Sequence, residues 1–154
     1  MQAIEFLKQE HGKAKAAFKE IEGAPAARRG SLWTKLRPEL ELHEKQEETH
    51  LYGPAAREVQ GDKSLADWEA THHREVQEAE SLIREISRLD PADDRWLATV
   101  KKLRGALEEH IRKEEQEIWP KIERVWDAPR LQEAGRKMEA MKATETASET
   151  ASSR

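Results

Sequence analysis

The stretch Leu107-Glu-Glu-His-Ile-Arg-Lys-Glu-Glu-Gln-Glu-Ile-Trp-Pro120 decides the fold, because it puts polar side chains where an apolar stripe should continue. His110 and Glu114 are four residues apart, so on a helix both side chains leave from one face. That face carries an apolar stripe upstream, made of Trp96, Val100, Leu103 and Leu107. An imidazole and a carboxylate on a core-facing stripe must meet a partner, since an unpaired buried charge is expensive.

Three further segments show the same intrusion of polar side chains into a helical stripe. Periodic apolar residues predict amphipathic helices over residues 4–21, 33–51 and 65–86. The polar residues on or beside these stripes are His11, then His43 with Glu47, then His72 or His73. His43 and Glu47 repeat the four-residue spacing of His110 and Glu114.

Capping and helix-breaking residues separate these segments. Gly23-Ala-Pro25 ends the first helix, and Ser31 is the expected N-cap of the second, in which Pro38 predicts a kink or a late start. Asp62 or Ser64 caps the third helix, and Asp90-Pro91 predicts the start of the fourth. Four long helices with short connections predict an all-α, up-down-up-down four-helix bundle.

The composition supports one helical domain with an appendage. The chain has 154 residues, of which 36% are hydrophobic and 38% charged, and the helix formers Ala, Glu, Lys, Arg and Leu dominate. The bundle and a short extra C-terminal helix, from about residue 128, are expected to form a domain over residues 1–141. Residues 142–154 are polar and of low complexity, so we expect a disordered tail there.

Charge and cysteine usage exclude several classes of function. A net charge of -4 spread over mixed-sign helices gives no basic stripe, so no nucleic-acid partner is expected. The absence of cysteine excludes disulfides, iron–sulfur clusters and a thiol nucleophile. The charged N-terminus does not read as a signal peptide, and no apolar run is long enough for a membrane span. We therefore expect a cytoplasmic protein without a membrane partner.

The recurrence of histidine on four helices favours a metal site. Neutral imidazoles suit iron, zinc or copper, and two glutamates can bridge and offset the charge of two neighbouring ions. A single histidine on an apolar face is more commonly a hydrogen-bonded core residue, and a single glutamate on a charged helix is usually solvated. The same intrusion on every helix, twice with a glutamate at the fourth following residue, favours the metal interpretation over packing.

Taken together, the motifs resemble the hemerythrin-like, or HHE cation-binding, domain family over residues 2–126. The matching stretches are Leu7-Lys-Gln-Glu-His11, Leu42-His-Glu-Lys-Gln-Glu47, His73-Arg-Glu-Val76 and the stretch that begins at Leu107. The resemblance implies a four-helix bundle that holds two iron ions, bridged by an oxo or hydroxo group. It also implies terminal ligands from His11, His43, His73 and His110, with Glu47 and Glu114 bridging.

The chain departs from the founding oxygen carriers of that family at two positions. They have a second histidine on the third helix, where this chain has Gln77 counted from His73, or Val76 counted from His72. They also have a carboxylate five residues after the fourth-helix histidine, a position held here by Glu115. A reversible oxygen-carrier role is therefore less favoured.

Two choices between neighbouring residues stay open from the sequence. Apolar periodicity favours His72 as the ligand, whereas the family spacing favours His73, and we favour His73. Glu114 is preferred to Glu115, because it repeats the spacing of His43 and Glu47. Candidates for an additional ligand are Glu44, His50 and Tyr52.

The resemblance implies a protein that binds, senses or reacts with O2, nitric oxide or hydrogen peroxide. Catalase-like disproportionation of peroxide is the enzymatic version that we favour. The alternative is a module that binds or stores iron, or another divalent metal, without turnover. A third possibility is a purely structural helical module whose histidines are packing residues.

Overall fold

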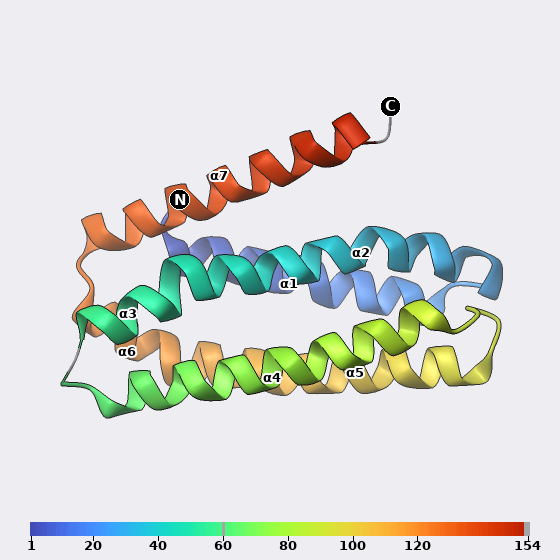
Figure 1. The fold of residues 1–154 in the computed structure, drawn as a ribbon, viewed down its shortest axis with the longest axis horizontal. Helices are drawn as coiled ribbons and strands as arrows, with labels where there is room; N and C mark the ends of the chain where they lie inside the picture. The colour runs from blue at the N-terminus through green and yellow to red at the C-terminus, as the bar shows by residue number, and fades with distance from the viewer. Residues whose placement is uncertain (60, 153–154) are drawn as a thin grey trace.

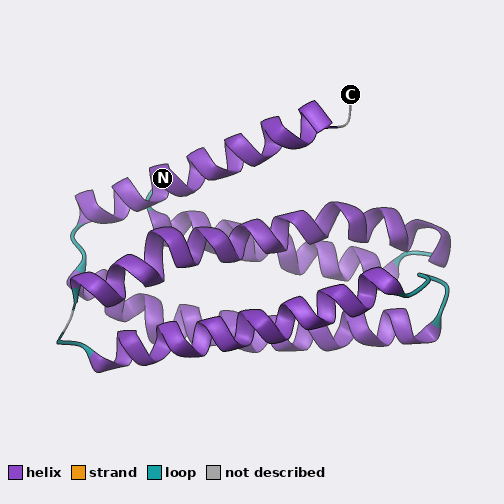
Figure 2. Ribbon diagram, viewed as in Figure 1, coloured by secondary structure: helices purple, strands orange, loops and turns teal. Residues whose placement is uncertain are grey.

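The structure, a computed structural model, describes residues 1–59 and 61–152, with side chains through residue 146. All regular elements among these residues are helical (Figure 2). The long helices are α1 (Ala3–Gly23), α2 (Ala26–Glu47), α4 (Lys63–Arg88), α5 (Asp94–Lys113) and α7 (Ala128–Ser152). The short elements are the π-helical turns η1 (Glu48–Tyr52) and η2 (Glu114–Ile118), and the helices α3 (Gly53–Glu58) and α6 (Trp119–Val125).

The first four long helices form the predicted up-down-up-down bundle. Helix α1 packs on α2 and α5, and α4 packs on α5 (Figure 1). The π turns and short helices continue α2 and α5 at the end of the bundle where α7 begins (Figure 1). No described helix is long and apolar enough to cross a membrane.

Several helix boundaries differ from the prediction. Helix α2 already begins at Ala26, because Pro25 supplies the extended residue before it, and Ser31 instead donates its hydroxyl to the Arg28 carbonyl. Asp93, not Asp90, caps α5 by accepting from the Arg95 amide. The Asp62 cap of α4 is confirmed. Pro38 lies inside α2, which begins well before it.

Helix α7 is longer than the predicted C-terminal piece. It continues to Ser152, so residues 142–152 are helical where the composition predicted a disordered tail; residues 153–154 lie outside the described residues. Alanine and glutamate in this segment have high helix propensity, and extending an existing helix is easier than nucleating one. Its first half packs on α1 and α2, whereas its second half diverges from the bundle (Figure 1).

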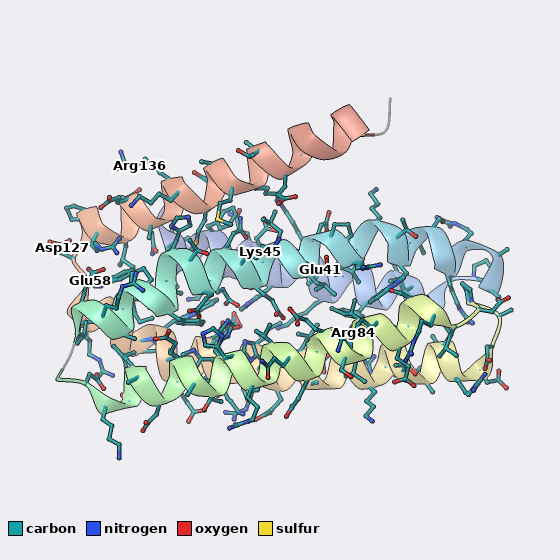
Figure 3. The ribbon with its side chains drawn as sticks, viewed as in Figure 1. Glu41, Lys45, Glu58, Arg84, Asp127 and Arg136 are labelled. Carbon is teal, nitrogen blue, oxygen red and sulfur yellow. The ribbon has the colours of Figure 1, made fainter. Side chains whose placement is uncertain are left out.

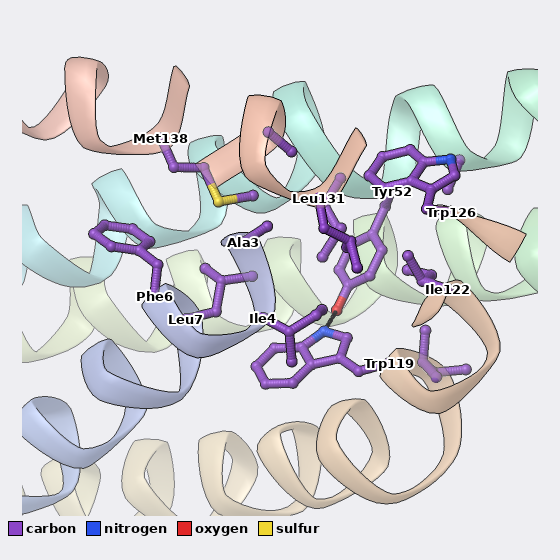
Figure 4. Packing of buried hydrophobic residues seen from close by; sticks show 14 of the residues in the cluster. Ala3, Ile4, Phe6, Leu7, Tyr52, Trp119, Ile122, Trp126, Leu131 and Met138 are labelled. Atoms are coloured by element: carbon purple, nitrogen blue, oxygen red, sulfur yellow. Dashed lines mark hydrogen bonds between the residues drawn. The ribbon is translucent and has the colours of Figure 1, made fainter. Parts of the chain in front are cut away.

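The buried apolar side chains form two clusters, one toward each end of the bundle. The cluster at the α3, α6 and α7 end contains Leu7, Leu51, Tyr52, Trp68, Trp119 and Met138 (Figure 4). The other contains Phe18, Leu40, Ala79 and Leu103. On each bundle helix the polar residues singled out by the sequence come between members of the two clusters. The fold therefore sandwiches a polar layer between two apolar ones.

Candidate metal centre

The polar layer brings two groups of ligand-type side chains together. One group consists of His11, His43, Glu47 and Glu114, and the other of His72, His110, Glu47 and Glu114. Within each group the nitrogen and oxygen atoms lie within 4.8 Å of one another. Both groups share the two glutamates, so the layer offers two adjacent positions with a common pair of carboxylates.

The imidazole nitrogens and carboxylate oxygens of the layer lie close to one another. Nε2 of His11 lies 3.2 Å from Nε2 of His43 and 3.3 Å from Oε1 of Glu114. Nε2 of His43 is 3.4 Å from Oε2 of Glu47, and Nε2 of His110 is 3.5 Å from Oε1 of Glu114. Because His72 of α4 also belongs to one of the groups, imidazole nitrogens and carboxylate oxygens from all four bundle helices converge on one small volume.

Unpaired buried atoms show that this donor set fits metal ions. Among the described residues, Oε2 of Glu47, Oε1 of Glu114 and both ring nitrogens of His72 are buried and have no hydrogen-bond partner. Buried polar atoms are almost always paired, so several orphans in one layer require an explanation. Metal ions are the simplest one, because a divalent cation satisfies carboxylate oxygens and imidazole nitrogens together.

A π turn begins at or directly after each shared glutamate. Glu47 immediately precedes η1, and Glu114 is the first residue of η2. The wider turn directs both the fourth and the fifth residue after each glutamate into the core. Leu51 and Tyr52 are thus both buried after Glu47, as are Ile118 and Trp119 after Glu114.

The aromatic residue that ends η1 and the one that follows η2 contact each other beside the polar layer. The indole Nε1 of Trp119 donates a hydrogen bond of 2.7 Å to the Tyr52 hydroxyl (Figure 4). That hydroxyl donates in turn to Oε2 of Glu114. Trp119 also stacks on His11, with ring centroids 4.9 Å apart. These contacts fix one oxygen of Glu114 and leave the other facing the histidines.

His110 is oriented from its other side by a carboxylate. Its Nδ1 is hydrogen-bonded to Oε2 of Glu75, and Oε1 of Glu75 accepts a hydrogen bond of 2.7 Å from Lys113. A carboxylate on the far nitrogen of a metal-binding imidazole fixes the ring and raises its basicity. The sequence indicated this contact between Glu75 and His110 only weakly, because Glu75 is one of many glutamates on α4.

Burial and mutual repulsion shift the acid–base properties of the layer. Desolvation, followed by the charge of Glu47, raises the pKa of Glu114 to about 7. Desolvation, followed by repulsion from the nearby His110, lowers the pKa of His72 to about 3. Burial alone would lower the pKa of His110, but the carboxylates of Glu114 and Glu75 raise it to about 9. Without metal, the layer thus brings buried carboxyl and imidazole groups together at an unfavourable electrostatic free energy.

The structure places most predicted site residues in the layer, but not His73. Of the pair on α4, His72 is 1% exposed and joins the layer, whereas the His73 side chain is 56% exposed and lies beside Glu48. The structure therefore groups His72, and not the preferred His73, with the other ligand-type side chains of the layer. The physical cause of this placement is the helical period, since His72 continues the buried face of Trp68 and the next residue turns away from it.

The remaining candidates lie around the layer. Oε1 of Glu115 is 3.9 Å from Nδ1 of His11, but Glu115 belongs to neither ligand group. Glu44 faces the adjacent cavities, and burial, followed by repulsion from Glu47, raises its pKa to about 8. Tyr52 reaches the layer through Glu114, and His50 is part of neither group.

A small cavity connects the layer with the surface between α1, α2 and α5. Its volume is about 40 Å³, and His11, His43, Glu47 and Glu114 form its inner wall. The intermediate wall is apolar, formed by Ala14, Phe18, Leu36, Leu40, Leu107 and Ile111. Such a volume accommodates a few water-sized molecules at most.

The sequence matches the family model of the hemerythrin HHE cation-binding domain over residues 2–122. The chain belongs to the hemerythrin HHE family. Its bundle is similar to the crystal structure of a hemerythrin HHE cation-binding domain-containing protein from Mycobacterium kansasii, with a TM-score of 0.77 and 26% sequence identity. The similarity covers 93% of this chain and 86% of that one. No curated protein matches the sequence significantly.

One regularity of this hemerythrin domain was missed by the sequence analysis. The order His, Glu, aliphatic residue, aromatic residue occurs at His43, Glu47, Leu51, Tyr52 and again at His110, Glu114, Ile118, Trp119. A proline follows each copy, as Pro54 and Pro120. Proline cannot donate a backbone hydrogen bond and crowds the carbonyl four residues earlier, which favours a wider turn. The repeat was therefore a usable signal for the two π turns.

Proposed function

We propose that this hemerythrin domain holds two iron ions in its polar layer and there binds, senses or reacts with O2, nitric oxide or hydrogen peroxide. One observation carries the proposal: two groups of buried ligand atoms share Glu47 and Glu114. This arrangement matches a carboxylate-bridged metal pair. Iron suits a donor set of imidazoles and carboxylates, although zinc and manganese use the same atoms.

The histidines divide between the two positions. His11 and His43 serve one position, and His72 and His110 serve the other. Both histidines of the first position line the cavity, whereas His110 alone lines it from the second. The layer presents fewer imidazoles than the oxygen carriers have, because Val76 occupies the helix-three position counted from His72. Fewer protein ligands leave a position for a small molecule, which supports a reactive site over a closed structural one.

Peroxide disproportionation is the enzymatic reaction that we favour. A bound di-iron centre would supply redox cycling, in which one peroxide is oxidised to O2 and a second is reduced to water. The protein contributes the apolar wall around Phe18 and Leu40, which limits access by bulk water and admits small molecules. Glu44, whose raised pKa of about 8 keeps its carboxyl protonated near neutral pH, lies where it can hold a proton beside the cavity.

Metal analysis and optical spectroscopy test the proposal. Protein reconstituted anaerobically with Fe²⁺ and exposed to air should contain two iron ions per chain and show near-ultraviolet charge-transfer absorption. His72→Ala and His110→Ala should each reduce the iron content, whereas His73→Ala should retain both ions. Absence of iron binding in the wild type would support a purely structural module instead, and full iron content in His110→Ala would remove His110 from the ligand set.

Turnover distinguishes the reactive site from a storage module. The iron-loaded protein should release O2 from hydrogen peroxide over many cycles, with its iron content unchanged. A narrow cavity also predicts that a bulky organic hydroperoxide reacts much more slowly than hydrogen peroxide. Iron that chelators remove readily, together with no sustained O2 release, would favour binding or storage without turnover.

A further inference from the structure

A second set of ligand-type side chains lies outside the polar layer, in a groove between α2 and α4. The groove has a volume of about 450 Å³. Glu41 and Lys45 of α2 and Arg84 of α4 line it (Figure 3). His72 and His73 also line it, so the groove extends from the surface to a residue of the buried layer.

His73 meets two carboxylates at this groove. Its Nε2 lies 3.1 Å from Oε1 of Glu48 and 3.8 Å from Oε1 of Glu69. One ligand atom from each of the three residues lies within 4.8 Å of the others. Glu48 comes from η1, and the other two residues come from successive turns of α4. One imidazole and two carboxylates at such spacing form a three-ligand site for a divalent cation.

The charges at this set are not balanced by the protein. Two carboxylates face a single imidazole, and among the described residues no lysine or arginine forms an ion pair with Glu48 or Glu69. Oε2 of Glu48 is enclosed and has no hydrogen-bond partner in the part of the chain that the structure describes. A simple ion pair between His73 and Glu48 leaves both this oxygen and the charge of Glu69 uncompensated, whereas a bound cation compensates both.

A second observation connects this set with the buried layer. His72 is 1% exposed, neither of its ring nitrogens has a partner, and it lines the same groove. Each element that supplies an outer residue also adjoins an inner one, since Glu48 follows Glu47 and His73 follows His72. On both elements, adjacent residues therefore place one ligand-type side chain in the outer set and one in the buried layer.

We propose that Glu48, Glu69 and His73 form an outer divalent-cation site, from which an ion passes along the groove to His72 and the buried layer. The site is partly exposed, so water completes its coordination and the ion exchanges readily. The cation is of the class that accepts mixed imidazole and carboxylate ligands, such as Fe²⁺, Zn²⁺ or Mn²⁺. The binding itself stands alone, whereas the transfer step rests on the proposed di-iron function.

Calorimetric titration of the metal-free full chain with Zn²⁺ tests the outer site. The wild type should show tight binding by the layer and one additional weaker equivalent. His73→Ala and Glu69→Gln should weaken that additional event about tenfold or more, while the tight binding is unchanged. His50→Ala is the matched control, because His50 is another partly exposed histidine near η1 that belongs to neither set, and it should bind like the wild type.

The outcomes separate this inference from the proposed function. An additional event that persists unchanged in both variants overturns the outer site. If the wild type shows the weak binding event but no tight one, the di-metal layer is overturned and the outer site is still supported. For the transfer step, anaerobic Fe²⁺ uptake should be several-fold slower in His73→Ala with the same final iron content. An unchanged uptake rate overturns the transfer.

Discussion

The phenol of Tyr52 donates a hydrogen bond to Glu114, the carboxylate that both ligand groups share. Burial, reinforced by the negative charge of Glu114, raises the pKa of Tyr52 well above its usual value and keeps the phenol protonated. The tyrosine can therefore act as a donor that holds one oxygen of Glu114, while the other stays directed at the histidines. Trp119 fixes the phenol from the opposite side.

Replacing Tyr52 by phenylalanine tests this arrangement. Tyr52→Phe leaves the buried Trp119 Nε1 without an acceptor and removes a donor from Glu114. An unsatisfied buried donor costs about 1–3 kcal/mol, which corresponds to a fall in Tm of roughly 2–10 °C for the metal-free protein. Scanning calorimetry measures the shift. An unchanged Tm would mean that a water molecule replaces the hydroxyl or that the bond is not formed.

Apolar periodicity predicted the four bundle helices and the inward position of His11, His43, Glu47, His110 and Glu114. It succeeded because each of these residues lies between apolar residues on one helical face, and burial follows that face. The same rule favoured His72, which lies in the layer, whereas the family spacing favoured His73, which lies outside it. The buried position of a side chain is thus a local property that the helical period determines.

Other features depend on contacts that local sequence does not encode. The pairing of His110 with Glu75 joins α5 to α4, and any of several glutamates on α4 has similar local context. The hydrogen bond between Trp119 and Tyr52 joins two residues far apart in the chain, although the local repeat marks the two π turns themselves. The continuation of α7 depends on a helix that is already docked on α1. Each requires knowledge of which elements are neighbours.

The metal-free protein should lose stability as the pH rises from about 6.5 to 9. Burial, and then repulsion from Glu47, raises the pKa of Glu44 to about 8 and that of Glu114 to about 7, so ionising either carboxyl disfavours the folded state above pH 4.5. His110 acts in the same direction. Burial lowers the pKa of His110, but the carboxylates of Glu114 and Glu75 raise it more strongly, to about 9. The stabilising contribution of His110 is therefore complete below pH 6.5 and is lost as the pH rises through 9.

His72 affects stability in the opposite direction, because it destabilises the folded state as the pH falls. Burial lowers its pKa to about 3, so the folded state is penalised as the pH falls below 6.5, where the unfolded imidazole takes up a proton. Urea unfolding from pH 5 to 9 should therefore show a shallow pH dependence below pH 6.5, where His72 opposes Glu44 and Glu114, and a steep loss of stability above it. Bound metal requires ionised carboxylates and neutral imidazoles, so the loaded protein should not show the loss at high pH. A flat profile for the metal-free protein would contradict the proposed charge arrangement.

The docking of α7 depends on a glycine. A Cβ at Gly135 would lie 2.0 Å from the Met1 carbonyl oxygen and 2.9 Å from the Ala3 amide nitrogen. Gly135→Ala should therefore displace α7 or the start of α1 and lower the Tm, despite the higher helix propensity of alanine. Gly105→Ala is the matched control, because a Cβ there meets nothing within 4 Å and should be neutral or stabilise by up to about 1 kcal/mol. Equal effects of the two substitutions would contradict close docking of α7.

The carboxylate behind His110 should control metal affinity at one of the two positions. Its hydrogen bond to His110 lowers the pKa of Glu75 to about 2, and Lys113 acts in the same direction, so Glu75 is ionised at any working pH. Glu75→Gln retains an acceptor for Nδ1 of His110 but removes the charge that makes the ring a stronger ligand. Metal affinity at the His72–His110 position should fall about tenfold or more, while the His11–His43 position changes less.

Competition titrations against a metal chelator measure this difference, and Glu109→Gln supplies the control. Glu109 lies on α5 next to His110 in sequence, but it is exposed, and its one ion pair among the described residues is with Arg112, so its substitution should leave both affinities unchanged. Lys113→Gln should give an intermediate effect, since it removes the ion pair that holds Glu75 in place without removing the carboxylate. If Glu75→Gln weakened both positions equally, the carboxylate would act through the overall charge of the layer and not through the orientation and basicity of His110.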